Sequence, residues 1–127
     1  MEKLNGKKKL SVSVFISGRG TNLKSLINFS NRKNCPIKIV LVITNNKKAK
    51  GIYFAKKSKI KLSFIDYKNK TKAENKILFD LKKHNIDLIC LAGFMKILTK
   101  KIVNFYDGKI LNIHPSLLPK YKGLNTH

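Results

Sequence analysis

The chain alternates short apolar segments with amphipathic segments, and this alternation limits the folds open to it. Residues 11–17 (SVSVFIS) are β-branched and aromatic, as in a strand, and residues 22–29 place Leu23, Leu26 and Ile27 at helical spacing. The same order then repeats. The predicted strands are residues 11–17, 37–44, 62–65, 86–92 and 109–114, and the predicted helices are residues 22–29, 49–57, 71–84 and 98–105. Strands separated by helices favour an α/β fold with a mostly parallel central sheet and helices on both faces.

Length and composition indicate one domain. A chain of 127 residues, 43% of them hydrophobic, can form a single modest core. We divide it into a Lys-rich extension, residues 1–10, and a domain, residues 11–127. The extension lacks the apolar stretch of a secretory signal, and no apolar run approaches the roughly 18 residues of a membrane span. We therefore expect a cytoplasmic protein that does not bind membranes.

The two cysteines do not suggest a metal centre. Cys35 and Cys90 lie far apart in the sequence, without the paired spacing of metal ligands and without a nearby histidine cluster. We expect reduced thiols and no bound metal.

The net charge of +22 first suggests a nucleic-acid-binding protein. Lysine is spread along nearly the whole chain, however, and arginine occurs only at Arg19 and Arg32. No basic stripe interleaved with aromatic residues is present, so we expect no specific nucleic-acid partner. The lysines are more simply explained as a solvated surface produced by a coding bias, which could also attract small anionic substrates.

A glycine-rich turn, residues 17–22 (SGRGTN), follows the first predicted strand. Backbone N–H groups at such a strand-to-helix turn can hold an anion. The turn does not complete a dinucleotide-binding fingerprint, because Leu23 occupies the place of the third glycine and no acidic residue ends the second strand. A single phosphate fits better than a pyrophosphate. Alternatively, the glycines only form a tight turn and Thr21 or Asn22 caps the helix.

Asn112 and His114 end the last predicted strand, in the segment NIHPSLLP. Side chains two apart on a strand share a face, so an amide donor and an imidazole converge there. Such a pair can stabilise an oxyanion and transfer a proton, as acyl transfer to an amine requires. A lone histidine at a strand end is also often a structural residue.

Three motifs in order resemble the phosphoribosylglycinamide formyltransferase family. They are SGRGTNL (17–23), LAGFMKIL (91–98) and ILNIHPSLLPKYKGLNTH (110–127). The segment after Ser-Leu-Leu-Pro is similar to that of the glycinamide ribonucleotide enzymes and differs from that of methionyl-tRNA formyltransferases. The resemblance implies a Rossmann-like three-layer formyltransferase fold for residues 11–127, with the C-terminal part missing.

The resemblance also implies roles for individual residues. Gly20, Thr21 and Asn22 would hold the phosphate of glycinamide ribonucleotide. Asn112 and His114 would be catalytic, and 10-formyltetrahydrofolate would donate the formyl group. The folate-binding residues would be Lys70, Met95, Lys96, Ile97, Leu98 and Asn112. Lys70 and Lys96 stand where the family has arginine, which keeps the charge and loses the planar fork.

The family's aspartate that orients the histidine lies beyond the His-Pro-Ser-Leu-Leu-Pro loop, and this chain ends at His127 before reaching it. We interpret the sequence as a fragment with little activity of its own. Other hypotheses remain: another folate-dependent formyltransferase or deformylase, a non-catalytic folate- or nucleotide-binding remnant, and a nucleic-acid-binding module, whose binding would depend steeply on salt. The sequence does not indicate an oligomeric state.

Overall fold

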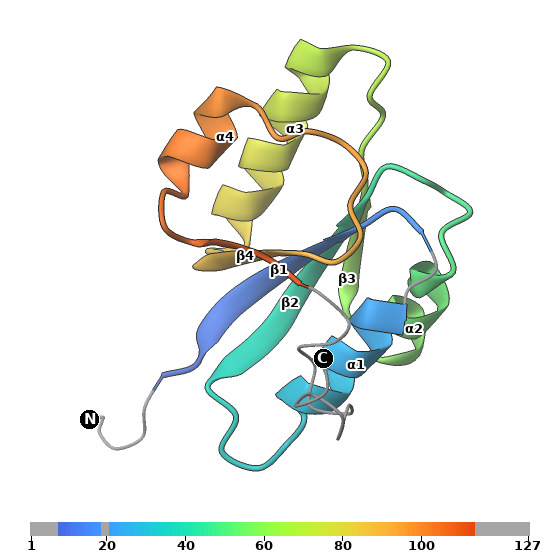
Figure 1. The fold of residues 1–127 in the computed structure, drawn as a ribbon, viewed down its shortest axis with the longest axis vertical. Helices are drawn as coiled ribbons and strands as arrows, with labels where there is room; N and C mark the ends of the chain where they lie inside the picture. The colour runs from blue at the N-terminus through green and yellow to red at the C-terminus, as the bar shows by residue number, and fades with distance from the viewer. Residues whose placement is uncertain (1–7, 19–20, 114–127) are drawn as a thin grey trace, which may run out of the picture.

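The computed structural model describes residues 8–18 and 21–113. Within them, one parallel sheet has the strand order β3-β2-β1-β4-β5 (Figure 1). The strands are β1 (Leu10–Ile16), β2 (Ile37–Thr44), β3 (Lys61–Phe64), β4 (Leu88–Leu91) and β5 (Ile110–Asn112). The helices are α1 (Thr21–Ser30), α2 (Gly51–Lys57), α3 (Lys70–Lys83) and α4 (Lys100–Phe105). The α/β class, the parallel sheet and its covering helices are as predicted.

Strand β1 lies at the centre of the sheet and is buried on both faces. Val12, Val14 and Ile16 pack toward α1 and α2, and Phe15 packs toward α3 and α4. All four side chains are fully buried. Figure 1 shows the two helix pairs on opposite faces of the sheet. The molecule therefore has three layers and two hydrophobic clusters that share the central strand.

A β-bulge in β2 changes which of its residues face each cluster. Val12 pairs with Ile39 and Ser13 pairs with Leu41, so Val40 has no partner on β1. Strict alternation would put Ile39 and Leu41 on the same face. Instead Ile39 packs with the α1/α2 cluster and Leu41 with the α3/α4 cluster. The uninterrupted apolar run of residues 37–44 hides this change of face, because every position in it suits a core.

Side-chain caps fix where two helices begin. The Asn69 side chain accepts a hydrogen bond from the Lys72 amide at the start of α3, and the Thr99 hydroxyl accepts one from the Ile102 amide at the start of α4. Such caps satisfy N–H groups that lack partners within the helix. They explain why α3 and α4 begin at Lys70 and Lys100.

The predicted boundaries agree with the observed ones to within one or two residues for most elements. Residues 37–44 form β2 as predicted. The apolar segment 86–92 extends beyond β4, which has only four residues, because Ile86 and Ala92 are also buried, and the Ala92 amide still donates to the Phe15 carbonyl of β1 at 2.9 Å. In the part of the chain described, no helix is long and apolar enough to cross a membrane.

Asp80 forms a polar group on the buried side of α3. It is only 5% exposed, and its carboxylate accepts hydrogen bonds from the Ser63 hydroxyl and from the Lys76 ammonium, the latter at 3.0 Å. Lys76 itself is half-exposed. The sequence places Asp80 on an amphipathic helix but gives no sign that its side chain turns inward. This contact ties α3 to strand β3.

Asp80→Ala should lower the free energy of unfolding by about 1–3 kcal/mol, because it leaves the buried Ser63 hydroxyl without its acceptor. Lys76→Ala is the control and should cost less than about 1 kcal/mol, since a half-exposed ion pair is screened by water. Urea unfolding of both variants measures the difference. Equal losses would mean that the ion pair, not the buried hydrogen bond, carries the stabilisation.

Burial raises the pKa of the Cys90 thiol to about 11. Cys35 and Cys90 are both free and buried. Because the thiolate of Cys90 forms only as pH rises toward this value, we expect iodoacetamide to modify Cys90 at least about 100-fold more slowly in the folded chain than in urea at pH 8. Peptide mass spectrometry over time measures both rates. Rapid native labelling of Cys90 would contradict its burial between β1 and the helices.

Candidate active site

The connections of the sheet reverse direction between β1 and β4. From β1 the chain proceeds through α1 and α2 outward to β3, and α3 then returns it to β4 on the other side of β1. Loops that leave neighbouring strands in opposite directions open a crevice at the strands' carboxyl ends, where ligands bind in sheets of this type. The segments at this edge are the turn after β1, the loop 92–99 after β4, and the end of β5 (Figure 1).

Ser17 joins three of the segments that leave the carboxyl edge. Its hydroxyl donates to Asn45 Oδ1 at 2.6 Å and accepts from the backbone N–H of Met95 at 2.8 Å. Its carbonyl oxygen accepts from Asn46 Nδ2 at 2.9 Å. The loops after β1, β2 and β4 are therefore held together by one buried serine.

The loop after β4 makes one wall of a pocket of about 420 Å³. Gly93 starts this loop with φ of +78°, a backbone conformation that other residues rarely adopt, so the chain can turn sharply away from the sheet. The other wall comes from α3, α4 and the residue Tyr67 before α3. The lining residues are Tyr67, Lys70, Glu74, Ile77, Met95, Lys96, Ile97, Leu98, Thr99 and Ile102.

An aromatic chain lies beside the pocket. Phe94 packs edge-on against buried Phe15 at 5.3 Å between centroids, and Tyr67 lies 6.2 Å from Phe94. The Lys96 ammonium lies 5.6 Å from the centre of the Tyr67 ring. Burial raises the pKa of the Tyr67 phenol, so this ring stays neutral at physiological pH. Lys96 thus rests on an uncharged aromatic surface.

The polar groups of the pocket are two lysines, a carboxylate and a hydroxyl. Lys70 begins α3, and Glu74 one turn later accepts a hydrogen bond from the Thr99 hydroxyl. The pocket thus presents two ammonium groups against one carboxylate, a positive excess that favours an anion. Met95 and Ile97 are 78% and 91% exposed, so their side chains offer apolar surface to a ligand. The pocket suits a molecule with a flat apolar body and an acidic end.

Two sets of ligand-binding residues are predicted from the sequence, one for the folate and one for the phosphate. The structure brings most of the folate set together. Lys70 and the segment Met95, Lys96, Ile97, Leu98, which are distant in sequence, line the same pocket. Thr21 and Asn22 begin α1, at the N-terminal end of that helix, as a phosphate site requires. Gly20 and His114 lie outside the described residues.

Asn112 is the last residue of β5 and is exposed at the carboxyl edge. It pairs with Leu91 of β4, and the next amide, of Ile113, donates to the Leu91 carbonyl at 2.8 Å. Asn112 therefore stands beside the strand from which the pocket loop departs. Its predicted convergence with His114 stays a prediction.

Sequence reasoning missed Tyr67, Glu74 and Thr99 as residues of this edge, and it gave Ser17 no role of its own within the turn 17–22. Thr99 precedes a helical segment and could have been identified as a cap. Nothing in the sequence pairs it with Glu74, or Ser17 with Met95, because these contacts join segments that only the sheet order brings together. Across the described ranges, no group of three or more His, Cys, Asp or Glu residues could hold a metal ion.

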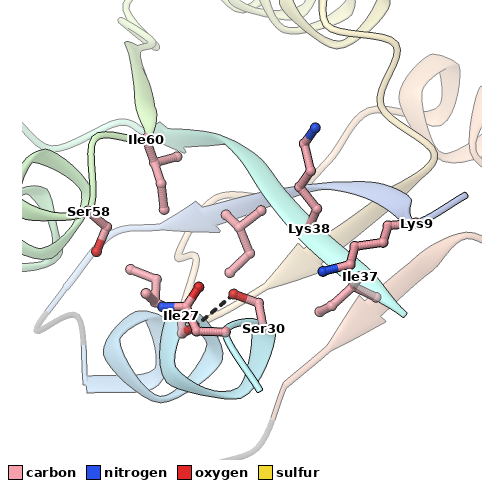
Figure 2. A pocket seen from close by; sticks show the side chains of 9 residues that line it. Lys9, Ile27, Ser30, Ile37, Lys38, Ser58 and Ile60 are labelled. Atoms are coloured by element: carbon pink, nitrogen blue, oxygen red, sulfur yellow. Dashed lines mark hydrogen bonds between the residues drawn. The ribbon is translucent and has the colours of Figure 1, made fainter. Parts of the chain in front are cut away.

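A second pocket, of about 300 Å³, lies at the opposite end of the sheet (Figure 2). Ile27 and Ile60 lie inside it, and Lys9 and Lys38 lie at the starts of β1 and β2. The C-terminal ends of α1 and α2 meet here, and their partial negative charge opposes an anion. The carboxyl edge is therefore the stronger candidate.

Comparisons with known proteins identify the family of the chain. The family described as formyl transferase matches residues 10–127. The phosphoribosylglycinamide formyltransferase of Haemophilus influenzae is 44% identical over 119 residues, which are 91% of this chain and 56% of that protein. The trifunctional purine biosynthetic protein adenosine-3 of Homo sapiens is 43% identical over 124 residues, 95% of this chain and 12% of that protein.

Solved structures give the same result. The crystal structure of phosphoribosylglycinamide formyltransferase from Brucella melitensis has a TM-score of 0.81 and 38% identity, over 94% of this chain and 64% of that one. The chain thus spans a little over half the length of the single-enzyme relatives that it matches. With a family match that covers nearly every residue and a sheet of the same architecture, the chain belongs to the formyl transferase family.

Proposed function

We propose that this chain provides the formyl-donor pocket of an enzyme that transfers a formyl group from 10-formyltetrahydrofolate to the amine of glycinamide ribonucleotide, in purine biosynthesis. The observation that carries the proposal is the pocket that gathers Lys70 with Met95, Lys96, Ile97 and Leu98. The relatives of this chain in Haemophilus influenzae and Brucella melitensis carry the name phosphoribosylglycinamide formyltransferase. As part of the same proposal the protein is cytoplasmic, its partners are these two small molecules, and it has no specific nucleic-acid partner.

The pocket's chemistry suits a folate. A volume of about 420 Å³ lies within the range of small-molecule sites. The apolar side chains of Met95, Ile97 and Leu98 can cover the flat pterin and benzoyl groups, and the ammonium groups of Lys70 and Lys96 can pair with the glutamate carboxylates. A flexible lysine gives such a contact less geometric definition than arginine would.

The phosphate of the ribonucleotide is assigned to the turn at Gly20, Thr21 and Asn22. The described part of this segment begins α1, so free N–H groups and the positive end of the helix face the carboxyl edge. Placing the acceptor there and the donor in the pocket puts the reacting groups between them, near the end of β5. Asn112 lies at that end.

In the proposed reaction the amine nitrogen attacks the formyl carbon and forms the new C–N bond. The carbonyl π electrons move to oxygen, where the Asn112 amide and protonated His114 stabilise the negative charge. The bond from this carbon to N10 of the folate then breaks, and the leaving nitrogen gains a proton from His114. The proton that the attacking amine gives up passes to the now neutral His114, which regains its starting form. The products are formylglycinamide ribonucleotide and tetrahydrofolate.

Asn112→Ala and His114→Ala should each lower turnover by roughly 10²–10⁴-fold, the usual worth of an oxyanion donor or a positioned acid. Tetrahydrofolate release by the complete enzyme measures this, with exposed Asn104→Ala on α4 as the control. A rate near that of the unsubstituted enzyme in either variant would rule out its assigned role. Residues 1–127 alone should transfer formyl groups very poorly, since the family's orienting aspartate lies beyond them.

Lys96→Ala and Lys70→Ala should each weaken tetrahydrofolate binding by about 3- to 10-fold, because each removes one charge-assisted contact to a carboxylate. Lys72→Ala is the matched control, an exposed lysine of α3 that does not line the pocket. Calorimetric titration of the 127-residue chain measures the dissociation constants. The difference in dissociation constant between each pocket variant and the unsubstituted chain should shrink as the salt concentration rises. Equal affinities for all variants would place the folate elsewhere.

A further inference from the structure

Ser17 contacts the pocket loop of the proposed function and lies close in sequence to the turn assigned to the phosphate. It follows Ile16, the last residue of β1, and lies four residues before Thr21, where α1 begins. Its hydroxyl accepts the hydrogen bond of the Met95 amide, at 2.8 Å, and Met95 belongs to the pocket assigned to the folate. One buried side chain thus touches the loop of the donor site while its backbone continues into the acceptor site.

The Ser17 hydroxyl has a defined orientation. Its hydrogen is donated to Asn45 Oδ1 at 2.6 Å, so its lone pairs are left to accept from Met95. Asn46 also donates to the Ser17 carbonyl, which restrains the backbone of the same residue. With its donor, acceptor and carbonyl contacts all satisfied, Ser17 has little freedom to shift relative to either loop.

The chain offers a natural comparison on the same strand. Ser13 is fully buried in β1, but among the described residues its hydroxyl has no hydrogen-bond partner. The two serines share chemistry and burial. They differ in that only Ser17 connects the strand to loops at the carboxyl edge, so a specific role can be separated from the general effect of removing a buried hydroxyl.

We propose that Ser17 is a positioning residue that fixes the distance between the donor pocket and the phosphate turn, and so couples the binding of the two substrates. The proposal rests on the proposed function for the identity of the ligands. Ser17 does not touch the reacting atoms. It holds the Met95 backbone against the end of β1. A folate bound at the loop and a phosphate bound at the turn would then keep a fixed relative position.

The test compares Ser17→Ala with Ser13→Ala in the 127-residue chain. Hydrogen exchange followed by NMR reports the Met95 amide without any ligand, and Ser17→Ala should speed its exchange at least about 5-fold, while Ser13→Ala leaves it unchanged. Calorimetry should show a 3- to 10-fold weaker affinity for tetrahydrofolate in Ser17→Ala, roughly the effect of one hydrogen bond. Titrating glycinamide ribonucleotide with and without tetrahydrofolate measures the coupling free energy between the two ligands. This coupling free energy should approach zero in Ser17→Ala.

The outcomes separate this proposal from the proposed function. Tetrahydrofolate binding that is equal in the unsubstituted chain and in Ser17→Ala, with unchanged Met95 exchange, overturns the role of Ser17 and leaves the folate pocket intact. No tetrahydrofolate binding in the unsubstituted chain overturns both. Equal losses in Ser17→Ala and Ser13→Ala would show a general effect of core polarity and would also overturn the proposal. Ser17→Thr, which keeps the hydroxyl, should restore the protection of the Met95 amide.

Discussion

The burial of β1 on both faces and along both edges is the constraint on which this structure depends. The strand hydrogen-bonds to β2 on one side and β4 on the other, and its side chains fill two clusters at once. A strand in that position favours apolar side chains, and Ser13 is an exception, a buried hydroxyl without a hydrogen-bond partner among the described residues. The helices of both layers pack against the strand, so its carboxyl end is a well-supported place for a site.

Residues at the carboxyl end of β1 support the loop that forms the candidate site. Phe15, the last β1 residue to face α3 and α4, supports Phe94 of the pocket loop, and Ser17 holds Met95 of the same loop. The apolar core and the polar edge therefore position the same short segment from two directions. The side chains of Met95 and Ile97 are too exposed to hold the loop in place by burial. The backbone of the loop and the side chain of Phe94 hold it instead. This arrangement lets the loop present apolar surface to a ligand without collapsing onto the core.

Much of the fold could be predicted because its signals are local. The run of residues 37–44 and the spacing of Leu23, Leu26 and Ile27 indicate strand and helix without knowledge of their neighbours. The bulge at Val40 could not be predicted, since a segment apolar at every position suits either face. The inward turn of Asp80 and the pairing of Ser17 with Met95 depend on the strand order β3-β2-β1-β4-β5. The grouping of Lys70 with residues 95–98 came from resemblance, and only the folded chain explains it physically: α3 begins and the loop after β4 passes at the same edge.

The excess of positive charge shows why geometry must supply the specificity. With 28 basic and 6 acidic residues, most lysines have no carboxylate to pair with, and the net charge of +22 attracts anions to the protein as a whole. An ammonium group therefore does not mark a site by its charge. Lys96 differs from the others in its setting, over the neutral ring of Tyr67 and beside the apolar residues of the pocket loop. Lys24, Lys47 and Lys82 also lie over aromatic rings, and Lys24 lines a pocket of about 470 Å³ between α1 and α2. That pocket lies away from the crevice where the sheet connections reverse. The general field can draw an anionic substrate toward the protein, whereas the pocket at the carboxyl edge combines charge, apolar surface and the support of Phe15 and Ser17, so that a bound folate would be held in one orientation.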